Sequence, residues 1–249
     1  MADPEDQSLQ ILRLIAEHLK RIKYPTLTRP KVRPDEPPTI ELVSWGIQAY
    51  SLPWIRHFGT LISGILTLSD ADNRASVRIV GRPSFELCAH VYYVKKHLKQ
   101  FLDRGDLDTA WKFLMPIATG SRYVSELDSQ MNREFGHLFP TAAHISKAVN
   151  CFKEVMPEGS EDDYSYLSEY CHPNMMAFKQ HYQWTTPETM EMIPVVVFGA
   201  YGAIAGSAIQ GIATVYELLG IGKESKVRKV IHQVMLDFVK EGRKLSDKG

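Results

Sequence analysis

The chain has 249 residues, 44% hydrophobic and 23% charged, and this composition excludes a disordered protein because disordered chains carry too little apolar material to build a core. Lysine and arginine together number 29, as do aspartate and glutamate, so no net charge attracts nucleic acid or an acidic surface to the whole molecule. The widely spaced Cys88, Cys151 and Cys171 fit neither a disulfide framework nor a paired zinc or redox motif. An acidic, polar start excludes a secretory signal. We therefore expect one cytoplasmic domain over residues 1–249.

Apolar residues recur at helical spacing along most of the chain, which predicts an all-α bundle of seven to nine helices. The first helix is expected over residues 7–23. Five prolines then predict an extended surface connector over residues 24–38. The strongest local basic run of the chain overlaps this connector. A solvated linker is the plainer interpretation, and contact with phosphate backbones is the alternative. The basic residues are Lys20, Arg21, Lys23, Arg29, Lys31 and Arg33.

Prolines divide the next helical stretch in the prediction. We expect a helix from residue 39 that is interrupted at Pro53 and resumes to residue 68, followed by a turn over 70–73. A helix over 73–103 follows, in which Pro83 either introduces a kink or begins a new segment. Further helices are expected over 107–135, with interruptions near Pro116 and Gly120, and over 139–156. His137 and His144 lack a carboxylate or cysteine at ligand spacing, so no metal site is expected there.

Three polar residues, Arg82, Glu86 and His90, recur every four positions and so share one helix face. A guanidinium one turn from a carboxylate keeps that carboxylate ionised, and a carboxylate one turn from an imidazole fixes its tautomer and raises its pKa. This row therefore predicts an acid–base arrangement. The alternative is an exposed ion pair beside an unrelated histidine.

A second polar segment spans residues 164–174 and ends any helix at Pro173. Acidic residues over 160–163 favour a helix start. Tyr164, Ser168 and His172 then share a face, and His172 lies at the carboxyl end, where the helix dipole stabilises imidazolium. A histidine in this position acts as a proton donor, a base or an anion anchor. Capping of the last carbonyls is the alternative role.

The pairing of the Arg82–Glu86 helix with this later segment resembles all-helical bacterial proteins of the HEPN (higher eukaryote and prokaryote nucleotide-binding) type. The resemblance covers residues 73–174. It implies a helical bundle that often dimerises, with a polar site and, in active members, metal-independent RNA cleavage in toxin or phage-defence systems. Active members carry an Arg-x4-6-His motif, whereas residues 165–167 here are not arginine, so Arg82 would take that place. The later segment contributes Tyr164 or Tyr166, Leu167, Ser168, His172 and Pro173 to the resemblance.

Cleavage of RNA without a metal needs a base, an acid and a cation for the charged transition state. His172, with His90 or Glu86, would supply the proton transfers, and Arg82 the cation. No metal or cofactor is expected, and RNA is the expected partner. The predicted catalytic residues are Arg82, Glu86, His90, Ser168 and His172, and the predicted substrate-binding residues are Tyr164, Tyr166, Asn174 and His181.

The C-terminal third is the most apolar part of the chain. Residues 175–184 predict a short strand or an ordered loop, and residues 185–188 predict a helix start. Residues 192–216 carry no charge and are long enough to span a bilayer, but Pro194, Gln210 and several glycines favour a long, buried Gly/Ala-rich helix or a dimer seam over a membrane span. A final amphipathic helix is expected over 224–245, with Val227, Val230, Ile231, Val234, Phe238 and Val239 inward. The predicted small-residue stripe consists of Gly199, Ala203, Gly206 and Ala213.

Three functions remain open from the sequence. The first is a HEPN-like protein that cleaves or binds RNA in a bacterial toxin or phage-defence system. The second is a non-catalytic scaffold, a homodimer in which the polar rows fix helix register. The third is a protein anchored in the membrane by a single span over 192–216.

Overall fold

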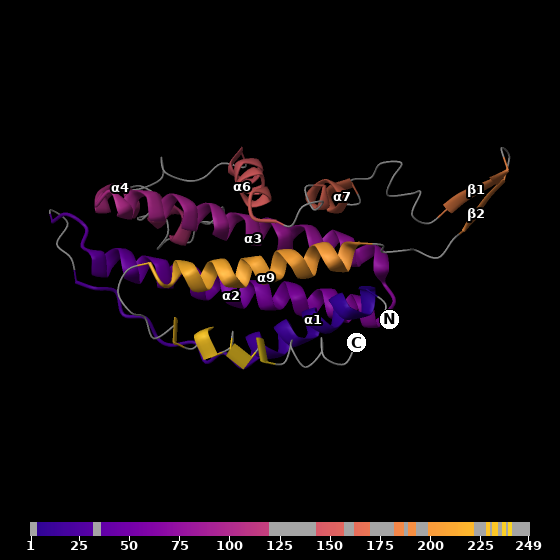
Figure 1. Cartoon of the computed structure of the whole chain (residues 1–249), viewed down its shortest axis with the longest axis horizontal. Helices are drawn as coiled ribbons and strands as arrows, with labels where there is room; N and C mark the ends of the chain where they lie inside the picture. Colours follow the sequence, from indigo (N-terminus) through magenta and orange to yellow (C-terminus); the bar gives the residue numbers. More distant parts are fainter. Residues whose placement is uncertain are drawn as a thin grey trace, which may run out of the picture.

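The computed structural model of the chain is a helical bundle with one small β-hairpin (Figure 1). The all-α prediction is confirmed for the body of the molecule, and the hairpin is an addition to it. The structure describes residues 4–31, 36–119, 143–156, 162–169, 182–186, 189–192, 199–221, 228–229, 231–233, 236–237 and 239–240. The elements are α1 (Pro4–Lys20), α2 (Ile40–Asp70), α3 (Arg74–Asp103), α4 (Leu107–Thr119), α6 (Ala143–Lys153), α7 (Asp163–Glu169), β1 (Tyr182–Thr186), β2 (Thr189–Met192) and α9 (Ala200–Leu218).

Side-chain caps begin the two longest helices. Thr39 Oγ1 accepts a hydrogen bond from the Leu42 amide at 3.3 Å, and Asn73 Oδ1 accepts one from the Ser76 amide at 3.4 Å. Between these helices the chain turns at Asp72, which has a φ of 53°. The predicted turn over 70–73 is therefore confirmed, and it makes α2 and α3 an antiparallel pair.

Prolines lie inside both long helices without ending them. Pro53 lies within α2, so the predicted interruption there is wrong. Of the two alternatives for Pro83, a kink or a new segment, the new segment is wrong, because α3 continues through Pro83. A proline removes one amide donor and crowds the preceding turn, which is a local cost. Buried residues on both sides of Pro53, including Tyr50 and Trp54, hold the two halves of α2 against the rest of the bundle. Tertiary packing outweighs the local cost here.

Helix α3 is the central element, since α2, α4, α6, α7 and α9 all pack against it. Helix α9 runs parallel to it, because Gly81 faces Ile204 near one end and Cys88 faces Gly211 further along. Helix α1 contacts both α2 and α9, which places it on the far side of the bundle from α7 (Figure 1). Helical spacing in α1 predicts one apolar stripe of Leu9, Leu12, Ile15, Ala16 and Leu19. The last four are buried and Leu9 is partly buried against the core, so the stripe is confirmed.

The C-terminal third departs from the sequence prediction. Residues 185–186 end a strand instead of opening a helix, and β1 pairs with β2 in antiparallel register from Tyr182–Met192 to Thr186–Thr189. A single helix over 192–216 is also wrong, because Met192 ends β2 and α9 begins only at Ala200. In β1, the tyrosine, the tryptophan and the two threonines favour extended structure. The prediction of a helix start at 185–188 considered only capping residues and did not take this preference into account. Across the residues that the structure describes, no helix combines the length and the apolar character needed to cross a bilayer.

The predicted small-residue stripe does not form the closest helix contact. Gly199 is the N-cap of α9 with a left-handed φ of 79°, and no atom lies within 4 Å of the position that a Cβ on Gly206 would occupy. The close approach is instead at Gly211, where an added Cβ would meet Cys88 Sγ at 2.5 Å.

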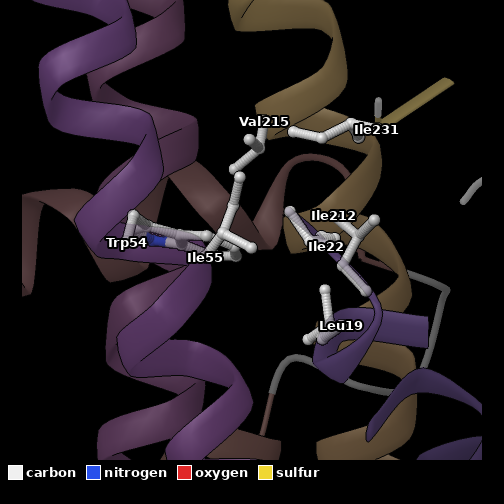
Figure 2. A pocket seen from close by; sticks show the side chains of 7 residues that line it. All are labelled: Leu19, Ile22, Trp54, Ile55, Ile212, Val215 and Ile231. Carbon is white, nitrogen blue, oxygen red and sulfur yellow. The ribbon is translucent and has the colours of Figure 1, made fainter. Parts of the chain in front are cut away.

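The described residues between 228 and 240 are helical and lie along the same long side of the bundle as α1 (Figure 1). Ile231 is buried as predicted, whereas Val239 is 44% exposed and its predicted inward position is wrong. Ile231 helps to enclose an apolar cavity of about 10 Å³ (Figure 2). A cavity of this size holds roughly one water-sized sphere, so it is a packing gap and not a ligand site. Its lining consists of Leu19, Ile22, Trp54, Ile55, Ile212, Val215 and Ile231.

Candidate functional site at the contact of α3 and α7

Arg82 and Glu86 of α3 meet Tyr164 of α7 in a group that we call the Arg–Glu–Tyr cluster. Arg82 Nε donates to Glu86 Oε1 at 2.9 Å, and the Tyr164 hydroxyl donates to the same oxygen at 2.9 Å. Arg82 Nη2 lies 3.4 Å from the Tyr164 hydroxyl oxygen and donates to it. Two segments about eighty residues apart in the chain thus place their polar groups in direct contact.

Apolar contacts hold α7 in this position, because a helix of seven residues is too short to be stable alone. Leu167 is fully buried and lies against Gly81, where a Cβ would be 3.3 Å from Leu167 Cδ2. The Tyr164 ring packs on Phe85 with a centroid distance of 5.7 Å, and Phe85 in turn packs edge-on against Phe152 of α6. The cluster therefore lies at the border between this apolar contact and solvent.

The cluster is partly open to solvent, since the Arg82 and Glu86 side chains are 27% and 25% exposed. The hydrogen bond to Glu86 raises the pKa of Arg82 further, so the guanidinium is charged throughout the physiological range. Burial, with the hydrogen bond to Glu86 as the next cause, raises the pKa of Tyr164. The tyrosine consequently remains a protonated hydrogen-bond donor at neutral pH.

Arg78 is a residue of this site that the sequence analysis did not single out. It is only 2% exposed, and its guanidinium carbon lies 5.3 Å from the centre of the Tyr166 ring. Arg82 lies over the Tyr164 ring in the same way, at 5.7 Å. Two arginines one turn apart on α3 thus face two tyrosines on α7 in cation–π contacts. Arg78 lies four residues before Arg82, so the spacing that identified Arg82 and Glu86 could also have identified Arg78 from the sequence.

Ser168 belongs to the same surface. Its Oγ is buried and makes no hydrogen bond of normal geometry within the described part of the chain, although it is near enough to the Tyr164 hydroxyl to lower the pKa of that group slightly. The predicted site residues His172, Asn174 and His181 lie outside the described residues.

His90 does not join the cluster as predicted. Its Nδ1 forms a hydrogen bond of 3.0 Å with the hydroxyl of Tyr50 on α2, so the predicted partner Glu86 and the observed partner differ. Burial raises the pKa of Tyr50 well above its usual range, which keeps that hydroxyl protonated. The polar row on α3 thus divides between two neighbours: Arg82 and Glu86 contact α7, and His90 contacts α2.

Comparison with protein-family models, curated proteins and solved structures finds no match for this chain. Within the described residues, no group of three or more histidine, cysteine or acidic side chains is placed to hold a metal ion. The groups that α3 and α7 bring together are the guanidinium groups of Arg78 and Arg82, the carboxylate of Glu86 and the hydroxyls of Tyr164, Tyr166 and Ser168. Guanidinium ions and hydroxyl donors in this combination suit a phosphate group.

Proposed function

We propose that this chain is a HEPN-like helical protein that binds RNA at the Arg–Glu–Tyr cluster and cleaves it without a metal, in a bacterial toxin or phage-defence system. The observation that carries the proposal is the contact of Tyr164 with both Arg82 and Glu86. It brings the segment that leads to His172 against the arginine helix. The HEPN resemblance requires this arrangement if Arg82 is to replace the missing arginine of the motif.

In this proposal Glu86 does not act as the base. Its Oε1 already accepts hydrogen bonds from Arg82 and Tyr164, so Glu86 is a positioning residue that orients the guanidinium. The remaining N–H groups of Arg82 then serve a phosphate oxygen, and Arg78 lies one turn away on the same helix. In the proposal, His172 carries the proton transfer.

Cleavage of a single-stranded RNA in the presence of EDTA tests this proposal. We expect Arg82→Ala and His172→Ala each to lower the rate by about 100-fold or more, since each removes a group that acts on the transition state. Arg13→Ala is the matched control, because it removes an arginine whose ion pair with Asp70 is about half exposed and lies on α1. An RNA that is cleaved equally well by all four proteins, or by none of them, contradicts the proposal.

A second candidate is the non-catalytic homodimeric scaffold, and one observation favours it. The charge of Arg82 is already balanced within the chain by Glu86. A polar cluster that only fixes the register of α7 on α3 needs such an internal pair and no ligand. The open face of α9 at Gly206, with Ile209 37% exposed nearby, is the surface for a second copy. Light scattering of the parent and of Ile209→Glu tests this candidate, which predicts a dimer that becomes a monomer. A monomeric parent eliminates it.

A further inference from the structure

We propose that the basic connector after α1 is a docking strip for the phosphate backbone of a single-stranded nucleic acid. The strip consists of Lys20, Arg21, Lys23, Arg29 and Lys31, and all five side chains are exposed. It lies on the side of the bundle where α1 packs, away from the Arg–Glu–Tyr cluster on α7 (Figure 1). This surface is separate from the proposed cleavage site and does not rest on it.

The connector is held against the bundle although it has no regular secondary structure. Ile22 is 6% exposed and Leu27 packs against the core. Further along, the Arg29 guanidinium lies 5.7 Å from the centre of the Trp45 ring on α2. Apolar residues thus face the bundle while the basic residues between them are exposed, which fixes the charges in a row before any ligand binds. A row fixed in advance loses less entropy on binding than a mobile linker does.

The lysines of the strip lack the acidic partners that lysines have elsewhere in the molecule. Lys95, Lys96, Lys99 and Lys112 each lie within 2.5–2.7 Å of a carboxylate oxygen. In the part of the chain that the structure describes, Lys20, Lys23 and Lys31 form no such pair, and Arg21 has only a long contact of 3.7 Å with Glu17. Positive charge is therefore concentrated here even though the whole chain has a formal net charge of zero.

The shape of the strip favours a nucleic-acid strand over a lipid surface. Insertion into a membrane interface uses an amphipathic helix with a broad apolar face, whereas Pro25 and Pro30 keep this segment out of a helix. The nine residues from Lys23 to Lys31 are separated by eight Cα–Cα steps, which span at most about 28 Å. A nucleic-acid strand carries one phosphate per about 3.4 Å when it is helically stacked, so this length faces up to about eight phosphates.

Tyr24 gives the strip a place for a base. The Tyr24 side chain is 41% exposed. Partial burial raises the pKa of its hydroxyl, and the positive charge of the exposed Arg56 on α2 opposes this with a smaller effect, so Arg56 lies close to the ring. An exposed aromatic ring beside a guanidinium is a stacking platform for an unpaired base. This feature favours a single strand over a duplex, whose bases are already stacked.

The salt dependence of oligonucleotide binding tests the inference. A labelled 20-nucleotide RNA and the DNA of the same sequence are titrated with the full chain at several salt concentrations, alongside the triple variant Lys20→Gln, Lys23→Gln, Lys31→Gln. Each lost phosphate contact on a single strand lowers the slope of log K against log salt by about 0.7, so we expect the slope to fall by about 2. RNA and DNA should bind alike, because phosphate contacts do not read the sugar. Tyr24→Ala should weaken binding about five-fold or more at an unchanged slope.

The matched control is Lys99→Gln, Lys112→Gln, Lys147→Gln, which removes the same number of exposed positive charges from other helices. Circular dichroism verifies that both triple variants are folded. Equal slopes in the two triple variants, no binding of either oligonucleotide by the parent, or preferential binding of the parent to phosphatidylserine vesicles each overturns the inference. RNA cleavage by the Arg82→Ala and His172→Ala variants is a separate measurement from oligonucleotide binding. A failure of the cleavage proposal can therefore be distinguished from a failure of this inference.

Discussion

Helix α3 is covered by two neighbours in opposite ways. Against α9 it presents Gly81 and Cys88, and the helices are so close that a Cβ on Gly211 would lie 2.5 Å from Cys88 Sγ. Against α7 it presents Arg82 and Glu86, which reach Tyr164 through hydrogen bonds at a partly exposed border. One helix therefore has a close, apolar interface and a polar one.

The difference shows which interface carries stability and which is available for chemistry. The α9 contact removes apolar surface from water and tolerates no added volume, because packed interiors have few voids. The α7 contact retains solvent access and side chains that a ligand can reach, and partly exposed ion pairs contribute little to folding. We expect substitutions on the α9 side to affect unfolding most strongly.

The largest expected effect is that of Gly211→Val. The added side chain would overlap Cys88 and lie near Trp54, both of which are buried, so we expect a loss of about 3 kcal/mol in the free energy of unfolding. Gly206→Ala is the control in the same helix, because nothing lies within 4 Å of the new methyl group, and it should stabilise by up to about 1 kcal/mol. Chemical denaturation measures both values. A Gly211→Val protein as stable as the parent would show that the two helices are not in close contact.

The second effect appears at alkaline pH. Burial raises the pKa of the Cys88 thiol far above its usual range, so Cys88 is neutral in the folded protein while the unfolded chain ionises near pH 8.5. Above pH 8.5 the folded state binds more protons than the unfolded state, and stability must fall as pH rises, by up to about 1.4 kcal/mol per pH unit. Between pH 8.5 and 10 the loss reaches about 2 kcal/mol.

Cys88→Ala separates this contribution from others. The variant is less stable at pH 7, since it leaves a small cavity, but its unfolding free energy should lack the decline that begins at pH 8.5. Tyr50→Phe is the control and should retain that decline, because an unfolded tyrosine titrates only near pH 10. Urea denaturation at pH 7, 8.5, 9.5 and 10 provides the comparison. A decline of the same size in Cys88→Ala would contradict the buried thiol.

The smallest effect is expected on the α7 side. Tyr164→Phe removes the hydroxyl that joins α7 to Glu86 and Arg82, and we expect a cost of about 1 kcal/mol. In a double-mutant cycle with Glu86→Gln, the two changes should couple by at least about 0.5 kcal/mol, because the residues are in direct contact. Tyr201→Phe, which loses a bond of 2.8 Å to Ser69 in another interface, should be additive with Glu86→Gln. Additivity in the Tyr164 cycle would mean that the cluster does not form in solution.

The helices were largely predictable from the sequence, and the exceptions have a common cause. The stripe of Leu12, Ile15 and Leu19 predicts a buried face by spacing alone, and all three are buried. Pro53 was expected to interrupt a helix, because a proline removes one amide donor and crowds the preceding turn, and the sequence shows only these local effects. The packing of distant residues around α2 decided the outcome, and a local pattern contains no information about it.

The site was predictable where neighbours lie on one helix and less so where they come from elsewhere. The four-residue spacing of Arg82 and Glu86 predicted their ion pair. Continuing the row to His90 failed, because positions four apart on an α-helix drift by about 40°. The two steps from Arg82 to His90 add up to about 80°, and His90 contacts Tyr50 on α2 instead of the cluster. Arg78 was missed although it continues the same row backward by four residues, because spacing alone does not show that another helix covers this position.

The separation of α3 and α9 along the chain has a consequence for biosynthesis. Residues 74–103 leave the ribosome about a hundred residues before 200–218, and translation at 5–20 residues per second makes this interval on the order of ten seconds. During that time the face of α3 that carries Gly81 and Cys88 lacks α9, although α2 is already available to pack on another face. The nascent chain thus exposes this closely packed face of α3 until α9 has been synthesised, and this is the stage at which a chaperone would protect it from aggregation.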